Sequence, residues 1–78
     1  MNGWSNKETW LVNLWFGDFF HMLQEDGHAI TAEYIENFVD NVIADSGARG
    51  NEFVADLLGS SLGNINYWEL GEHYNDEP

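Results

Sequence analysis

The chain has no cysteine and only two cationic side chains, Lys7 and Arg49. Without cysteine it forms no disulfide, no thiolate zinc site and no cysteine nucleophile, which fits a reducing, intracellular compartment. With so few cations it lacks the groups that hold phosphate, so we expect no direct binding to nucleic acid or to an anionic membrane. Residues 1–5 show no basic n-region or cleavage site, and no apolar run is long enough to span a bilayer. We therefore expect a cytoplasmic protein.

Acidic and aromatic side chains are abundant instead. Fourteen acids give a net charge of −12, and the 78 residues include four Trp, five Phe and three Tyr. Like-charge repulsion opposes a compact state, whereas each aromatic side chain buries a large area. A chain of this length makes one domain. We expect a single domain over residues 1–78 with an aromatic-rich core and a basic partner.

The stretch from residue 5 to about residue 25 organises the chain. Ser5 followed by Glu8 predicts a capping box at the start of a helix, and Gly27 predicts its end. At about 100° per residue, its apolar residues cover more than half of the helix circumference. They are Trp10, Leu11, Val12, Leu14, Trp15, Phe16, Phe19, Met22 and Leu23. Such a helix lies at the centre of a small bundle or keeps one side for a partner.

Three residues in or beside this stretch carry narrower expectations. Trp4 precedes the cap and is placed to fold back on the first turn as a hydrophobic staple. Gly17 suggests the close approach of another backbone. Asp18 falls within the apolar arc, so we expect a buried or half-buried acceptor.

Three further helices are expected, over about residues 32–45, 51–62 and 67–74, followed by an acidic tail over 75–78. Thr31 is the N-cap candidate of the second helix, and Asn66 followed by Glu69 forms a second capping box. No alternating strand pattern of useful length occurs. The predicted fold class is all-α, a small bundle of three to four helices around the aromatic-rich N-terminal helix.

Residues that could carry catalysis or hold a metal have simpler interpretations. Ser5, Thr31 and Ser46 are better explained as caps and loop residues than as nucleophiles. Glu69 and His73 are four residues apart on one helical face, but zinc needs three or four ligands fixed by the fold. We predict no enzyme activity, no catalytic residues, no cofactor and no dedicated metal site; a weak surface Ca²⁺ or Mg²⁺ site stays open.

Acidic stripes carry the sharper hypothesis. Glu33, Glu36 and Asp40 share one face of the second helix at i, i+3 and i+7, and Glu69 and Glu72 share a face of the last helix. One helical turn advances about 5.4 Å, close to the phosphate spacing of a nucleic-acid strand. Such stripes can imitate a phosphate backbone and occupy a Lys/Arg groove. The alternative is that a small protein simply carries a solvated acidic surface.

The opening NGWSNKETWLVNLW resembles the N-terminal signature, NGW-x-N-x-x-TW-x-V-x-LW, of a family of small proteins encoded by phages, plasmids and some bacterial genomes. The matching residues are Asn2, Gly3, Trp4, Asn6, Thr9, Trp10, Val12, Leu14 and Trp15. Residues 64–73 are similar to the closing helix of that family, except that Tyr67 stands between Asn66 and Trp68. The resemblance implies a shared helical fold and a mobile-element origin, and it carries no established activity.

In size, charge and lack of cysteine the chain is also similar to phage and plasmid inhibitors of host defence, such as anti-CRISPR and antirestriction proteins. We therefore expect a DNA-mimicking inhibitor that binds the basic nucleic-acid-binding surface of a CRISPR effector or restriction enzyme. The expected binding residues are Glu33, Glu36, Asp40, Glu69 and Glu72. The alternative is a helical interaction module, a homodimer or an adaptor, that uses exposed aromatics of the first helix. The oligomeric state stays open.

Overall fold

The computed structural model describes residues 3–44, 53 and 62–75. The elements whose bounds lie within these residues are α1 (Lys7–Glu25), α2 (Ala32–Ala44), the short 3-10 helix η1 (Leu62–Asn64) and α4 (Tyr67–Asn75). The fold is all-α, and no strand occurs among the described residues. The helix expected over residues 51–62 and the tail after residue 75 lie largely outside them.

Helix α1 begins one residue later than a Ser5 cap would place it. Asn6 is the N-cap, with extended backbone angles and a side-chain oxygen that accepts the Thr9 amide at 2.8 Å. The expectation of a Ser5 cap is therefore wrong. The Ser5 amide instead donates to the carboxylate of Glu69, whose side chain comes from the other end of the chain.

The other helix boundaries follow their local signals. Gly27 has a φ of +94°, its amide donates to the Gln24 carbonyl, and the His28 amide donates to the Leu23 carbonyl at 3.0 Å. This pattern is a Schellman motif, which confirms Gly27 as the stop of α1. Thr31 caps α2, because its hydroxyl accepts the Tyr34 amide at 3.1 Å.

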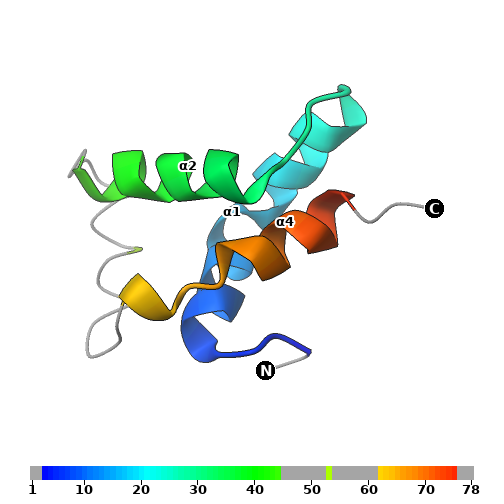
Figure 1. Ribbon diagram of the computed structural model, residues 1–78. Helices are drawn as coiled ribbons and strands as arrows, with labels where there is room; N and C mark the ends of the chain where they lie inside the picture. Colours follow the sequence, from blue (N-terminus) through cyan, green and yellow to red (C-terminus); the bar gives the residue numbers. More distant parts are fainter. Residues whose placement is uncertain (1–2, 45–52, 54–61, 76–78) are drawn as a thin grey trace.

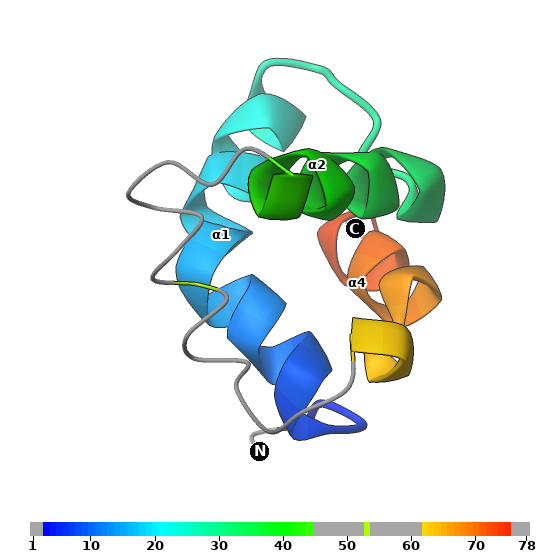
Figure 2. The ribbon, with the colours of Figure 1, turned by 90° about the vertical axis from the view of Figure 1, so that its left-hand side faces the viewer.

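Helix α4 lies beside both of the longer helices. It packs along α2 and against α1, so it joins the two long helices (Figures 1 and 2). At Gly71 the backbones come very close, because a Cβ there would lie 2.9 Å from the Ala32 amide nitrogen. The close backbone approach that the sequence suggested for Gly17 therefore occurs at Gly71.

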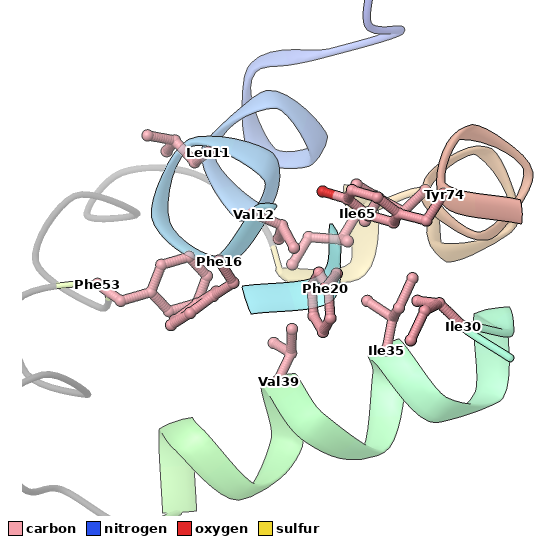
Figure 3. Packing of buried hydrophobic residues seen from close by; sticks show 11 residues of the cluster. Leu11, Val12, Phe16, Phe20, Ile30, Ile35, Val39, Phe53, Ile65 and Tyr74 are labelled. Carbon is pink, nitrogen blue, oxygen red and sulfur yellow. The ribbon is translucent and has the colours of Figure 1, made fainter. Parts of the chain in front are cut away.

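Phe20 lies inside the core and joins the three helices. It is fully buried among the core residues that Figure 3 shows. Its ring centroid is 5.2 Å from those of Phe38 on α2 and Tyr74 on α4. Burying one Phe side chain contributes about 1.5–3 kcal/mol. The other buried apolar residues are Leu11, Val12, Phe16, Ile30, Ile35, Val39, Phe53, Ile65, Leu70 and Tyr74. Of the described helices, none has the length and hydropathy needed to cross a membrane.

Two local expectations on α1 are corrected, and Trp4 makes a long-range contact. Asp18 is exposed, as are Leu14 and Met22, which lie four residues before and after it on α1. The space beside Gly17 holds the Asn13 side chain and the Tyr74 hydroxyl, so a side-chain pair and not a backbone approaches there. The Trp4 ring centroid lies 4.8 Å from that of His73 in the last turn of α4, and the staple on the first turn of α1 stays a prediction.

Candidate partner-binding surface

Two helix N-termini meet through a set of polar side chains. Asn66 caps α4 by accepting the Glu69 amide at 3.0 Å, while its own amide donates to the Thr9 hydroxyl at 2.8 Å. The side-chain amide of Asn6 in turn donates to the backbone carbonyl of Asn64 at 2.6 Å. These residues therefore have a structural role, since their hydrogen bonds hold the starts of α1 and α4 together.

The acidic stripe of α2 is exposed to solvent. Glu33, Glu36 and Asp40 are all exposed, whereas Ile35 and Val39 on the other side of the helix are fully buried. The separation follows from the helical period, which places residues i, i+3 and i+7 on one side. The structure thus brings the three predicted α2 residues together on one open face.

Tyr67 shows where this stripe lies relative to α4. Burial, followed by the charges of Asp40 and Glu36, raises the pKa of the Tyr67 hydroxyl to about 12. Both carboxylates are therefore close enough to act on a side chain of α4. Because Tyr67 lies near Asp40 while Gly71 lies against Ala32, α4 runs in the opposite direction to α2, as Figure 1 shows. The stripe therefore runs beside the start of α4.

The two predicted residues of α4 differ in their surroundings. The Glu69 carboxylate accepts the Ser5 amide at 3.1 and 3.3 Å and is half-buried. Glu72 is exposed. Glu69 therefore already has a partner within the fold, and Glu72 is the better placed of the two for an external partner.

Trp68 is a surface residue that the sequence reasoning did not select. Its side chain is 69% exposed, and it follows Tyr67 directly. The helical period could have predicted this exposure. Trp68 lies on the same side of α4 as Glu72, four residues on, and away from the buried Leu70 and Tyr74. An exposed Trp thus stands next to the acidic side of the α2–α4 pair.

A separate apolar surface lies where α1 meets α2. Phe19 is 36% exposed and stacks on Phe38, with ring centroids 5.2 Å apart. Met22, one turn further along α1, is 52% exposed, and Tyr34 on α2 is 40% exposed. We call Phe19, Met22, Tyr34 and Phe38 the α1–α2 apolar surface. It supplies a second candidate binding face, on the helix that the sequence singled out.

The residues considered for catalysis or metal binding make contacts within the fold. His73 packs on Trp4, and its ring centroid is 5.8 Å from that of His21. Within residues 3–44, 53 and 62–75, no three His, Asp or Glu side chains gather as a metal site would require. Ser5 and Thr31 contribute at helix starts, and Ser46 is outside the described residues.

The described surface therefore offers acidic and apolar faces suited to binding. No curated protein and no solved structure is significantly similar to this chain. The model of DUF7249, a family of unknown function, matches residues 1–77. Because the match covers nearly the whole chain, the protein belongs to the DUF7249 family of unknown function.

Proposed function

We propose that this protein is an inhibitor from a phage or mobile element, and that it acts in the bacterial cytoplasm on a host defence complex. Its target is the basic, nucleic-acid-binding surface of a CRISPR effector or restriction enzyme. One observation carries the proposal: Glu33, Glu36 and Asp40 form an exposed stripe on α2 in a chain with a net charge of −12. The resemblance to mobile-element proteins supports the origin.

The physical basis is electrostatic. Carboxylates about one helical turn apart present negative charge at intervals similar to those of phosphates. A strongly negative chain is steered toward a positive groove, and the association weakens as salt rises. Glu72 and the exposed Trp68 lie on the neighbouring helix. A large aromatic of this kind suits the centre of a protein interface, where Arg side chains pack on Trp.

The experiment compares two double charge reversals. Glu36→Lys with Asp40→Lys changes the stripe, whereas Glu25→Lys with Asp26→Lys changes net charge equally at exposed positions beyond it, at the end of α1. Each tagged variant is used for a pull-down from bacterial lysate at low and high salt, with and without competing DNA. We expect the wild type and the α1-end variant to capture a nucleic-acid-binding complex that DNA displaces, and the stripe variant to lose it. Equal capture by all three proteins would overturn the proposal.

A helical interaction module is the second candidate function. It is favoured by two large apolar side chains that α1 exposes, Met22 at 52% and Phe19 at 36%. Trp10 and Trp15 are partly buried and pack against the core, so they support this function less than the sequence suggested. Binding through apolar surface persists at high salt, since burial of apolar area is not screened. The same salt series therefore separates the two functions.

A further inference from the structure

We infer that the α1–α2 apolar surface binds an amphipathic helix of a partner protein, one that carries lysine or arginine beside its apolar side chains. The inference rests on the second candidate function and does not depend on the acidic stripe of α2. It specifies both the surface and the chemistry of its occupant.

Three of the four side chains of this surface pack on one buried ring. Buried Phe20 lies beneath it, with ring centroids 5.8 Å from Phe19, 5.2 Å from Phe38 and 6.4 Å from Tyr34. Met22 lies one helical turn beyond Phe19 on the same side of α1. Because the floor is packed, the exposed rings are held in place and lose little freedom when a partner covers them.

The border of this surface is acidic. Asp18, Glu25 and Asp26 are exposed and lie four residues before, three after and four after Met22. These spacings place all three carboxylates on neighbouring positions around Met22. Lys7 is the one lysine or arginine among the described residues, and it lies 15 residues from Met22, about 22 Å along α1. An occupant must therefore bring apolar side chains together with positive charge.

Charge also decides against the other occupants. A second copy seated through the same face would place the Asp18, Glu25 and Asp26 carboxylates of the two chains near one another, and each chain carries a net charge of −12. An anionic lipid surface would be repelled for the same reason. A basic amphipathic helix meets both requirements, because its apolar side chains recur every three to four residues, as Phe19 and Met22 do.

The test uses a synthetic peptide of about 18 residues, five helical turns, with leucine at helical spacing and lysine elsewhere. A scrambled peptide of the same composition, without an apolar face, is the charge control. Met22→Gln removes an apolar contact at an exposed position of the surface, and Leu14→Gln is the matched change at an exposed position outside the residues that define it. Circular dichroism confirms that each variant is folded before titration calorimetry is performed.

We expect the patterned peptide to bind the wild type and Leu14→Gln equally, and Met22→Gln about tenfold more weakly. The double change Glu25→Lys with Asp26→Lys should weaken it as well, whereas Glu36→Lys with Asp40→Lys should not. Equal binding of the two peptides, or no effect of Met22→Gln, would overturn the inference. Concentration-dependent dimerisation that Met22→Gln abolishes would overturn it in favour of a second copy. The two double variants act on different faces. If the peptide does not bind the α1–α2 apolar surface, the acidic-stripe proposal is unaffected, and loss of the acidic-stripe proposal leaves this inference unaffected.

Discussion

The backbone amide of Asn66 donates a hydrogen bond of 2.8 Å to the hydroxyl of Thr9. Thr9 is fully buried in the first turn of α1, and Asn66 is the residue that caps α4. The bond spans 57 residues of sequence. It holds the starts of two helices together, and with them the acidic face of α4 relative to α1.

Replacing Thr9 by Val is expected to lower the free energy of unfolding by about 1–3 kcal/mol, because the Asn66 amide loses its acceptor in a part-buried place. Val keeps nearly the same shape, so packing changes little. Thr9→Ser keeps the hydroxyl and is the control. Urea unfolding of the three proteins is the measurement. A smaller loss in Thr9→Val than in Thr9→Ser would show that the hydroxyl is unimportant.

Gly71→Ala is expected to destabilise the protein although alanine favours helices by about 1 kcal/mol over glycine. A Cβ at this position would lie 2.9 Å from the Ala32 amide nitrogen, which is backbone and cannot swing away. The helices α2 and α4 must then separate, at a cost of about 1–3 kcal/mol typical of overpacking. Thermal unfolding measures the change, and a raised midpoint would contradict the expected clash.

Asn75→Asp is expected to destabilise more than Asn75→Ala. The Asn75 side chain accepts the Ile30 amide at 3.1 Å and donates to the carbonyls of Ile30 and Gly71. A carboxylate would turn both donor contacts into repulsions, with a loss of about 2 kcal/mol against about 1 kcal/mol for alanine. Below the ordinary aspartate pKa of about 3.9, the protonated carboxyl group of the Asn75→Asp variant regains a donor, and the difference should shrink. Urea unfolding at neutral and acidic pH tests this, with no pH effect on the difference as the contrary result.

Tyr67 and Tyr74 make the fold sensitive to alkali. Burial, with the charges of Asp40 and Glu36, raises the pKa of Tyr67 from an ordinary 10.0 to about 12. Burial, with the charge of Asp18, also raises the pKa of Tyr74. The folded chain thus keeps protons that the unfolded chain loses. The contribution of Tyr67 to the free energy of unfolding is fully present below about pH 10 and is lost between about pH 10 and 12.

Tyr67→Phe is therefore expected to reduce the loss of stability between about pH 10 and pH 12, as measured by urea unfolding at several pH values. Tyr74 remains in this variant and keeps part of the slope. Asp40→Asn is the companion change, since removing one negative charge should lower the pKa of Tyr67 as followed by phenolate absorbance. An unchanged slope in Tyr67→Phe would show that this hydroxyl is not responsible.

Local signals predicted where most of the described helices start and stop. The capping bonds of Gly27, Thr31 and Asn66 join residues within five positions of each, so the nearby sequence contains the partners that define these helix ends. Ser5 and Asn6 show the limit of this reasoning, because both are good capping residues. Asn64 and Glu69 decide between them, since they bind the Asn6 side chain and the Ser5 amide from the far end of the chain.

The candidate surfaces were predictable to different degrees. Glu33, Glu36 and Asp40 are exposed as the helical period of α2 requires, since its buried side is narrow. The helical period predicts the same exposure for Glu69 and Glu72. Glu69 is half-buried because it accepts the amide of Ser5, which is 64 positions away in the chain. Asp18 was misplaced because its neighbours on the helix surface, Leu14 and Met22, are apolar and yet exposed, which the apolar pattern of α1 does not show.

The sequence by itself determined the all-α class, the helical period that separates acids from apolar residues on α2, and most of the caps. These depend on hydrogen bonds and side-chain spacing within a few residues. Only the tertiary structure decided which side of α1 is covered, which carboxylate accepts the Ser5 amide, and that Trp68, Phe19 and Met22 remain open to solvent. Those outcomes depend on where α4 packs against α1 and α2, which is set by contacts between residues far apart in the chain.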